Sequence, residues 1–293
     1  MTAITPTALG FTVTPDGWQK VLRGRTLTFR RLYDWADFEA VERLQRTVFG
    51  VSDHDLIAAS ILIVIPKTGG QILGAFAGAE LVGFLTAYGG YVAGKPLLVS
   101  DMLAVAPAWR GGLGFALKTL QAALALADGF HEISWTVDPL RAANARLNFE
   151  RLGASAREYH DDFYGSDFAS GLYGGLPSDR LVVTWPLEQA SVADRLFGRQ
   201  GPRDPGTLNE LPVFAAPGPA QARVPIPADI DSLVATDLDA ARGWRFRVRA
   251  ALHEAFAAGY AITGFASARD GDEGQLLLTR TESHRSAALS ERE

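Results

Sequence analysis

The sequence has no cysteine, and this absence excludes disulfide bonds, thiolate nucleophiles and cysteine-ligated zinc or iron–sulfur sites. It also has no block of basic residues. The 28 basic and 33 acidic side chains give a net charge of −5, which argues against nucleic acid as the main partner. The longest apolar run covers about residues 56–65 and is too short to cross a bilayer.

Signals for export and for several common enzyme classes are missing as well. The N-terminal residues lack a basic segment followed by a continuous apolar run, so we expect a cytoplasmic protein that binds no membrane. Neither a G-x-S-x-G serine elbow nor a G-x-x-x-x-G-K-[ST] phosphate loop is present. No second histidine completes a zincin motif at His131 or His253. Neighbouring side chains of His160-Asp161-Asp162 point to opposite faces of a strand, so no metal site is predicted.

What the sequence does have is a strand, a glycine-rich turn and a helix in succession between Pro96 and Gln121. The residues from 97 to 105 are mostly apolar, which is typical of a strand buried on both faces. Pro107 ends the pairing because it has no N–H, and glycines follow at positions 111, 112 and 114. Apolar residues at helical spacing begin at Leu113. Such a turn exposes backbone N–H groups at the positive end of a helix dipole, and this favours a phosphate or pyrophosphate ligand.

Two other interpretations compete with a phosphate site. A tight strand-to-helix turn needs glycines even without a ligand, and short glycine motifs often match by chance. A dinucleotide-binding turn needs G-x-G-x-x-G, but Leu117 stands at the place of the third glycine. The strand before such a turn also normally opens its domain, whereas this strand follows several other elements.

The rest of the chain alternates strands and helices, and predicts an α+β protein with a mixed sheet flanked by helices. Before the central strand we predict a strand at 26–32, helices at 35–48 and about 53–63, and a hairpin of strands at 71–77 and 81–87. After the helix that follows the glycines we predict a strand at 131–137, a helix from about 139 to 152, and strands within 157–165 and 179–187.

Composition divides the chain into five segments. These are an N-terminal arm at 1–24, a core at 25–187, a proline-containing linker at 188–222, a strand–helix–hairpin extension at 223–280 and a polar, disordered tail at 281–293. The extension contains a predicted helix at 238–259 and a turn at 270–272. Because about 60 residues are few for an independent core, we expect the extension to dock on the core.

The run VAPAWRGGLGFALK resembles the acyl-CoA signature of the GNAT superfamily of N-acyltransferases, V-x-P-x-x-R-G-x-G-x-G/A. Val105, Pro107, Gly112 and Gly114 match this pattern. The family pattern has one more residue between its arginine and the Gly-x-Gly pair, so either the loop is one residue shorter or Trp109 takes the arginine position. The resemblance implies the GNAT acyltransferase fold for the core, with a C-terminal α/β extension added to it.

Further blocks resemble one branch of this superfamily, the CoA-dependent N-succinyltransferases that act on D-amino acids alongside an N-succinylamino acid racemase. The blocks are EAVERLQRTVFG, GAFAGAELVGF, SWTVDPLRAANARLNFERLGA and GLPSDRLVVTWPL. This resemblance covers most of residues 26–187 and implies acetyl-CoA or succinyl-CoA as the co-substrate. It also implies a small amine, such as a D-amino acid, as the acceptor. A homodimer is one assembly that we consider.

The resemblance also implies which residues hold the acyl donor. Loop amides would bind the CoA pyrophosphate, and an amide on a central strand that splays from its neighbour would polarise the thioester carbonyl. The family has an asparagine near the start of the next helix, and Asn144 lies two residues from that place. The donor residues implied in this way are Leu103, Ala104, Val105, Arg110, Gly111, Gly112, Leu113, Gly114 and Asn144.

Acyl transfer to an amine needs a base for the amine and an acid for the leaving thiolate. Asp101 interrupts an apolar strand, and we expect it to face a cleft or a cation because an uncompensated buried carboxylate is costly. Asp138 is a second candidate base, with a helix N-cap as its alternative role. Phe149 stands where family members often have a tyrosine that acts as the acid for the leaving thiolate. Tyr159, Tyr164 or solvent would then supply the proton, and we count Tyr164 among the catalytic candidates.

A substrate carboxylate or a succinyl group needs a cation, and arginine suits this role because it binds carboxylate oxygens in pairs. Arg180 lies beside a predicted strand edge, and Arg245 shares a helix face with Arg249. The alternative for each arginine is a solvated or ion-paired side chain. Trp135 and Trp109 could line an apolar acceptor pocket, with core packing as the alternative.

These observations predict the transfer of an acetyl or succinyl group from acyl-CoA to a small primary amine. A second hypothesis is an acyl-CoA-binding module without catalysis, which Phe149 at the acid position favours. A third hypothesis, a dinucleotide-dependent oxidoreductase, predicts NAD binding without CoA binding.

Overall fold

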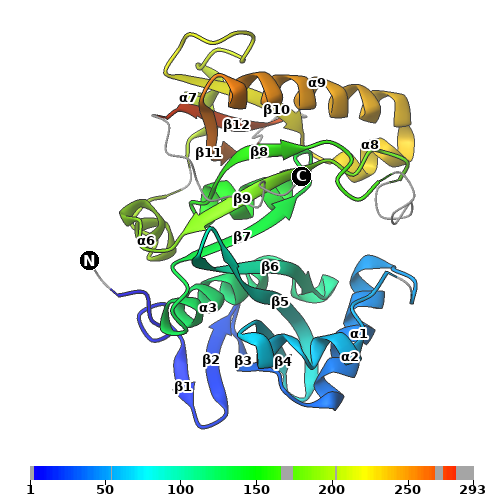
Figure 1. Cartoon of the computed structure of the whole chain (residues 1–293), viewed down its shortest axis with the longest axis vertical. Coiled ribbons are helices and arrows are strands. Elements are labelled where there is room, and N and C mark those ends of the chain that lie inside the picture. The colour runs from blue at the N-terminus through cyan, green and yellow to red at the C-terminus, as the bar shows by residue number, and fades with distance from the viewer. Residues whose placement is uncertain (1–2, 54, 166–173, 202, 268–272, 282–293) are drawn as a thin grey trace. The chain divides into compact units, whose positions relative to one another are not determined.

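The computed structural model describes residues 3–53, 55–165, 174–201, 203–267 and 273–281. The chain forms two compact units, one of residues 1–134 and 186–197 and the other of residues 135–185 and 198–293 (Figure 1). The boundary at residue 134 falls inside the segment 25–187 that we expected to form a single core. The predicted turn at 270–272 and all but the first residue of the predicted tail lie outside the described residues.

The strands of the first unit follow one another through the sheet in chain order. They are β1 Thr12–Thr14, β2 Gly17–Leu22, β3 Arg25–Arg31, β4 Gln71–Ala77, β5 Glu80–Val92, β6 Lys95–Val105 and β7 Glu132–Val137, the last of which continues into the second unit. Neighbours from β1 to β6 are antiparallel, whereas β6 and β7 are parallel. Mixed pairing of this kind is what the sequence pattern predicted.

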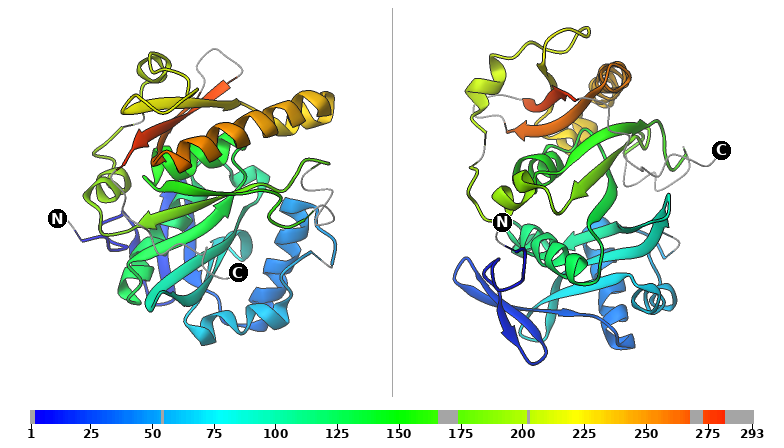
Figure 2. Two further views of the ribbon diagram at one scale, coloured as in Figure 1. Left: turned by 45° about the horizontal axis from the view of Figure 1, so that its top comes forward. Right: turned by 60° about the vertical axis from the view of Figure 1, so that its left-hand side comes forward.

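Helices cover both faces of this sheet. They are α1 Trp35–Phe49, α2 Ala59–Leu62, η1 Ile65–Thr68, η2 Pro107–Trp109, α3 Leu113–Ala127 and α6 Ala190–Leu196. On β5, Phe84 belongs to a buried cluster with Phe38 of α1, whereas the adjacent Gly83 faces Leu117 of α3. Because adjacent strand residues point to opposite faces, α1 and α3 lie on opposite sides of the sheet (Figure 2). The α+β class predicted from the sequence is therefore confirmed.

The N-terminal residues differ from the expected arm, because β1 and β2 lie within the segment 1–24. Phe11 is buried and packs edge-on against Phe29 of β3, with 5.3 Å between ring centroids. A two-residue turn of Arg23 and Gly24 joins β2 to β3, and both residues have positive φ, 51° and 75°. Such a turn matches the twist of the two strands. The sequence thus adds an ordered hairpin before the predicted first strand.

β6 is paired differently along its two edges. Its antiparallel pairing with β5 extends from Lys95 to Val105, whereas its parallel pairing with β7 is limited to Leu98 and Val99. Beyond Val99, β6 continues for six residues without a β7 partner in this register. The described pairing of β6 with β7 thus ends at Val99, and the splay implied by the family resemblance stays a prediction.

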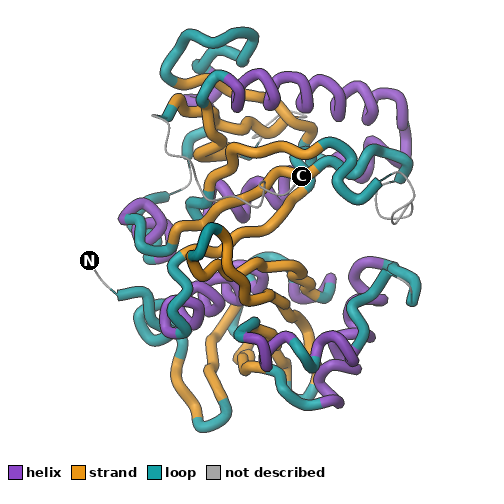
Figure 3. Tube along the Cα trace, in the orientation of Figure 1, coloured by secondary structure: helices purple, strands orange, loops and turns teal. Residues whose placement is uncertain are grey.

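The second unit contains one strand–helix–hairpin arrangement twice (Figure 3). The first copy is the end of β7, then α4 Ala142–Ala145 with the π-helical η3 Arg146–Arg151, then β8 Ser155–His160 and β9 Arg180–Pro186. The second copy is β10 Gln221–Pro227, α8 Ile230–Thr236 with α9 Leu238–Ala257, β11 Tyr260–Ala266 and β12 Glu273–Arg280. In the sheet the first copy has the strand order β7-β9-β8, and the second copy has the corresponding strands in the reverse order, β11-β12-β10.

The two copies also agree in detail. They meet where β8 pairs antiparallel with β11, at Ala156 and Ile262. Each of these residues comes three positions after a glycine of positive φ that follows the helix, Gly153 and Gly259. In both copies the hairpin register shifts at the next residue, between Ala156 and Glu158 and between Ile262 and Gly264. The second unit is therefore an internal repeat, which the sequence reading did not detect.

The repeat determines how the extension of residues 223–280 joins the rest of the chain. It continues a sheet through the β8–β11 pair and so covers an edge that β8 would otherwise expose. β10 becomes the outer strand, and its Pro225 and Pro227 have no N–H to offer to another chain. In the segment expected to be a linker, α6 and α7 Pro205–Asn209 form short helices. None of the helices in the described part of the chain combines the length and apolar character needed to cross a bilayer.

Candidate functional site

The glycine-rich turn predicted from the sequence lies between η2 and α3. Gly111 and Gly112 have φ values of 92° and 143°, a region that residues with a Cβ rarely occupy. Gly112 is the N-cap residue of α3, which begins at Leu113. The first N–H groups of a helix have no intrahelical acceptor and carry the positive end of its dipole. Gly114 lies within the first turn, where a Cβ would contact Leu103 of β6 at 3.6 Å, so it brings the helix close to the strand.

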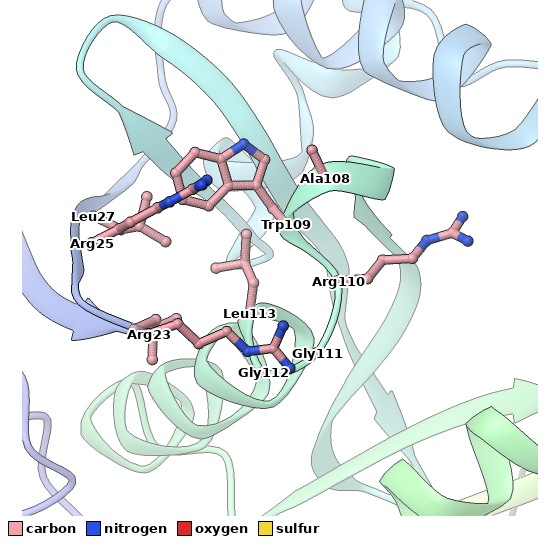
Figure 4. Close-up of a pocket in the computed structure, with 10 residues that line it drawn as sticks. Arg23, Arg25, Leu27, Ala108, Trp109, Arg110, Gly111, Gly112 and Leu113 are labelled. Atoms are coloured by element: carbon pink, nitrogen blue, oxygen red, sulfur yellow. The ribbon is translucent and has the colours of Figure 1, made fainter.

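A cavity of about 230 Å³ lies beside this turn (Figure 4). Predicted donor residues line one side of it, and arginines from the β2–β3 turn line the other. The lining residues are Leu22, Arg23, Arg25, Leu27, Ala108, Trp109, Arg110, Gly111, Gly112 and Leu113. All of them belong to the first unit, so this site is built within one compact part of the chain.

Two arginines of the cavity are held against the turn. The guanidinium of Arg25 lies over the ring of Trp109, 4.9 Å from the ring centroid. Arg23 packs so closely on Gly111 that a Cβ there would overlap its guanidinium. Arg110 extends in another direction, away from Arg23 and Arg25 (Figure 4). Among the residues that the structure describes, none of these three arginines forms an ion pair.

Asp101 lies in a β-bulge on β6. Along the β5–β6 pair, Ala87 faces Ser100 and Thr86 faces Met102, so Asp101 is the extra residue without a partner on β5. The hydroxyl of Thr86 accepts a hydrogen bond from the Met102 N–H at 3.2 Å. The bulge follows Val99, where the β6–β7 pairing ends, and it therefore lies just beyond the part of β6 that pairs with β7.

The surroundings of Asp101 change its acidity. The side chain is exposed, yet desolvation by neighbouring protein atoms raises the pKa of its carboxyl group, while a hydrogen bond with Thr86 opposes this rise. Burial and the negative charge of Asp101 also raise the pKa of Tyr88 on β5. A carboxylate with a raised pKa is a stronger base than an ordinary aspartate. That Asp101 faces a cleft or a cation stays a prediction.

Asp138 and Arg245 bind each other in the second unit. Two hydrogen bonds of 2.8 Å join the guanidinium to both carboxylate oxygens, and the two side chains are 4% and 0% exposed. One of these oxygens also accepts the Leu140 N–H at 2.9 Å. Desolvation favours the neutral acid, but the charge and hydrogen bonds of Arg245 outweigh it and lower the pKa of Asp138. The predicted substrate role of Arg245 and the predicted base role of Asp138 are therefore wrong, because the two side chains form a buried structural ion pair.

The same face of α9 carries two further residues that bind acidic partners. One turn after Arg245, Arg249 forms an ion pair with Asp179, which also accepts a hydrogen bond from the Tyr159 hydroxyl at 2.6 Å. Another turn on, His253 contacts Asp161 at 2.6 Å. The predicted sharing of one helix face by the two arginines is therefore confirmed. These contacts hold α9 against β8 and the start of β9.

Tyr164 and Arg180 come together in the second unit, as two residues predicted for different roles. The guanidinium of Arg180 lies over the ring of Tyr164, 5.0 Å from its centroid. The Tyr164 N–H donates to the Ser178 hydroxyl at 3.0 Å, and the Tyr164 side chain remains 39% exposed. A phenol and a guanidinium thus lie against each other in the second unit.

Other predicted residues take core positions in the second unit. Trp135 is buried and packs edge-on against Trp185 at 5.9 Å, so it forms part of the core and does not line an open acceptor pocket. Phe149, at the position where family members often have a tyrosine as general acid, is 1% exposed. Asn144 lies on α4 in the second unit, whereas the glycine turn belongs to the first.

A buried lysine lies under β6 in the first unit. The Lys118 ammonium donates to the Ser100 hydroxyl at 3.0 Å and to the Gln121 side-chain oxygen at 2.9 Å. Desolvation lowers the pKa of Lys118 to about 7. In the described ranges of the chain, no group of three or more His, Asp or Glu side chains is placed to hold a metal ion.

Of the three arginines that line the cavity, the sequence predicted Arg110 but not Arg23 or Arg25. It assigned residues 1–24 to an arm and therefore gave no role to Arg23, while Arg25 stood outside every motif. The available signal was the run GWQKVLRGRTLTF, in which two strand-like segments flank Arg-Gly. Nothing in the sequence alone brings that turn to the glycine loop, about 90 residues later in the chain.

No protein-family model matches this chain, and no curated protein matches it. Solved structures do match. A protein described as a GNAT-family acetyltransferase from Desulfovibrio desulfuricans aligns with 20% identity and a TM-score of 0.45, over 55% of this chain and 99% of its own. The ribosomal-protein-S18-alanine N-acetyltransferase of Escherichia coli aligns with 17% identity and a TM-score of 0.45, over 56% of this chain and 96% of its own.

A third structure shares more residues over a shorter stretch. The aminoglycoside acetyltransferase meta-AAC0020, from an uncultured soil metagenomic sample, aligns with 28% identity and a TM-score of 0.35, over 39% of this chain and 78% of its own. All of these TM-scores lie under 0.5, so the likeness by itself carries no conclusion about function.

Proposed function

We propose that this protein is an acyl-CoA-dependent N-acyltransferase that acts on a small amine. The observation that carries the proposal is the course of β6. The strand loses its β7 partner after Val99, passes a bulge at Asp101 and leads into the Gly111–Gly112 turn at the start of α3. The open strand edge, the carboxylate and the anion-binding turn follow one another along one segment of the first unit.

The acyl donor would bind along this segment. The pyrophosphate of CoA would accept hydrogen bonds from the N–H groups of the turn and of the first turn of α3. Backbone groups of β6 beyond Val99 would pair with the amides of the pantetheine arm, as an added strand pairs with a sheet edge. The thioester would then lie near Leu103 to Val105, which still pair with β5 on the other side.

Residues of this segment would supply the base and the oxyanion donor of the acyl transfer. Asp101 accepts a proton from the ammonium group of the acceptor, and the free amine attacks the thioester carbonyl carbon. A β6 amide between Leu103 and Val105 stabilises the oxyanion of the tetrahedral intermediate. The carbon–sulfur bond then breaks, the amine nitrogen gives its second proton to solvent, and the CoA thiolate takes up a proton from solvent. Tyr164, in the second unit, stays a predicted proton donor. The products are an amide and free CoA.

Acetyl and succinyl groups are the candidate acyl groups, and a D-amino acid is a candidate acceptor. Arg180 is the substrate arginine that we retain, because Arg245 is fully buried against Asp138. The contact between Arg180 and Tyr164 places a cation beside a phenol, which suits an acceptor that carries a carboxylate next to its amine. This proposal rests on the sequence resemblance for the acyl group and the stereochemistry.

Release of the CoA thiol tests the proposed reaction. Acetyl-CoA and succinyl-CoA are incubated with the full chain and a panel of D- and L-amino acids, and free thiol is measured with a colorimetric reagent. The chain itself adds no background because it has no cysteine. We expect amine-dependent release with one of the two donors. Absence of release with both donors, together with absence of CoA binding in calorimetry, contradicts the proposal.

The buried Phe149 favours a second candidate, an acyl-CoA-binding module without catalysis. A phenylalanine cannot protonate the leaving thiolate. A chain without another proton donor would therefore bind acyl-CoA and turn it over poorly. Tight CoA binding with no thiol release, in the wild type and after Phe149→Tyr, would support this candidate. Amine-dependent release by the wild type would exclude it.

A further inference from the structure

We propose that Arg23 and Arg25, on the turn between β2 and β3, form a subsite for the ribose 3′-phosphate of the CoA donor. This inference rests on the proposed function and adds a selectivity to it. The hairpin would make the protein discriminate between CoA thioesters and thioesters whose carrier lacks that phosphate.

The first support is the position of the two side chains. Both arginines line the cavity that also contains the Gly111–Gly112 turn, although they come from a segment about 90 residues earlier. Figure 4 shows Arg23 reaching toward the glycine turn and Arg25 lying against Trp109. Arg25 is held over Trp109, and Arg23 packs on Gly111. The positive φ of Arg23 and Gly24 fixes the turn that presents them.

The second support is charge. The chain has a net charge of −5, yet this cavity is lined by arginines that form no ion pair within the described part of the chain. Other arginines of the same unit are paired, for example Arg30 with Asp37 at 2.6 Å and Arg31 with Asp128 at 2.7 Å. Unpaired guanidinium groups that line one cavity attract an anion, and a phosphate accepts hydrogen bonds from their planar donors well.

The third support is the size of the cavity and the number of cationic groups in it. Sites that bury a whole ligand of drug size occupy roughly 300–1,000 Å³. The cavity of about 230 Å³ therefore holds one end of an acyl-CoA, and the remainder would follow β6. The helix start and the turn amides suit the diphosphate. Two further cationic groups then match the phosphate monoester, which carries a charge of nearly −2 and lies at the same end of the molecule.

The experiment measures binding of CoA and of dephospho-CoA, which lacks only the 3′-phosphate, by calorimetry on the full chain. The variants are Arg23→Gln and Arg25→Gln, which remove one charge each and keep a polar side chain. Arg43→Gln is the matched control because Arg43 is an exposed arginine on α1 of the same unit that does not line the cavity. Thermal unfolding of each variant confirms that it is folded, and Arg23→Lys tests whether charge alone restores binding.

We expect the wild type to bind CoA about tenfold or more tightly than dephospho-CoA, in line with charge-assisted hydrogen bonds to the missing phosphate. Arg23→Gln and Arg25→Gln should each weaken CoA binding about tenfold and change dephospho-CoA binding by less than about twofold, while Arg43→Gln changes neither. An equal loss for both ligands would assign the arginines to the diphosphate and overturn the inference. Unchanged CoA binding in both variants would overturn it as well.

The same measurement separates this inference from the proposed function. If the wild type binds CoA and dephospho-CoA equally, the 3′-phosphate subsite is wrong and the acyltransferase proposal stands. If the wild type binds neither ligand, both proposals fall together. Binding of 3′,5′-ADP alone, lost in the two cavity variants and kept in Arg43→Gln, would locate the subsite without any dependence on turnover.

Discussion

The buried ion pair between Asp138 and Arg245 predicts a large and specific loss of stability. Asp138→Asn removes the charge partner of a guanidinium that is 0% exposed and is bound through two contacts of 2.8 Å. Breaking a buried pair by removing one partner costs about 3–5 kcal/mol, because the other charge stays buried without compensation. We therefore expect Asp138→Asn to lower the free energy of unfolding by about that amount.

Two comparison variants make this prediction sharper. Replacing both partners, Asp138→Leu with Arg245→Met, should cost less than either single change, since no uncompensated charge remains buried. The exposed pair of Arg141 and Asp231 lies in the same unit, and its aspartate is 66% exposed. Asp231→Asn should therefore cost less than about 1 kcal/mol. Urea unfolding followed by circular dichroism measures all of these free energies.

The pH dependence of stability gives the same prediction a second test. Because Arg245 holds the pKa of Asp138 below its ordinary value, the pair stabilises the fold above that ordinary value, and the contribution is lost as the pH falls through the lowered pKa. Asp138→Asn should remove this part of the acid destabilisation. If Asp138→Asn unfolds within about 1 kcal/mol of the wild type but abolishes turnover, the structural role is refuted and Asp138 returns to the chemistry.

Three further predictions concern the first unit. Asp101→Asn should lower kcat about 100-fold or more and remove the acid limb of the pH–rate profile. The reason is that the wild-type base is protonated only as the pH falls through the pKa of Asp101, which is raised above 3.8. An acid limb that is unchanged in the variant would assign the base to another residue. Gly111→Ala should weaken CoA binding at least tenfold, because φ is 92° and the new Cβ overlaps Arg23, and calorimetry with CoA measures this loss. Lys118→Met should flatten the rise of stability with pH between about 7 and 10.5, where an unfolded lysine is protonated and the buried one is not. The wild-type slope there should reach up to about 1.4 kcal/mol per pH unit in urea unfolding, and equal slopes for the two proteins would show that Lys118 is charged in the fold.

Much of the fold follows from local sequence patterns. The predicted helix at 35–48 is α1, 35–49, and the predicted hairpin at 71–77 and 81–87 is β4 with the first part of β5. These elements were predictable because an apolar face of regular period is buried wherever the rest of the chain lies. The glycine turn and the start of α3 at Leu113 follow for the same local reason.

Features that depend on distant segments were not predictable from one sequence. Asp138 and Arg245 lie 107 residues apart, and nothing in either local pattern identifies the other as its partner. The β1 and β2 strands are short and half-exposed, so their periodicity is weak. The repeat in the second unit is carried by topology, glycine positions and bulges, which different side chains can satisfy equally well.

The candidate site shows the same division. The donor turn was predictable from its glycines, and Asp101 was predictable as a charge within an apolar strand. The bulge that exposes Asp101 depends on the register with β5, and the cavity arginines depend on a hairpin that packs on the turn. Register and tertiary contact are set by the whole sheet, so a local pattern cannot specify them.

The most direct test of the account is amine-dependent release of CoA thiol by the wild type and by Asp101→Asn, with acetyl-CoA and succinyl-CoA as donors. We expect release with one donor, a fall of about 100-fold or more in the variant, and CoA affinity that the variant retains. Release that is equal in the two proteins would contradict the role of Asp101. Absence of both release and CoA binding in the wild type would contradict the assignment of β6 and its glycine turn as an acyl-CoA site.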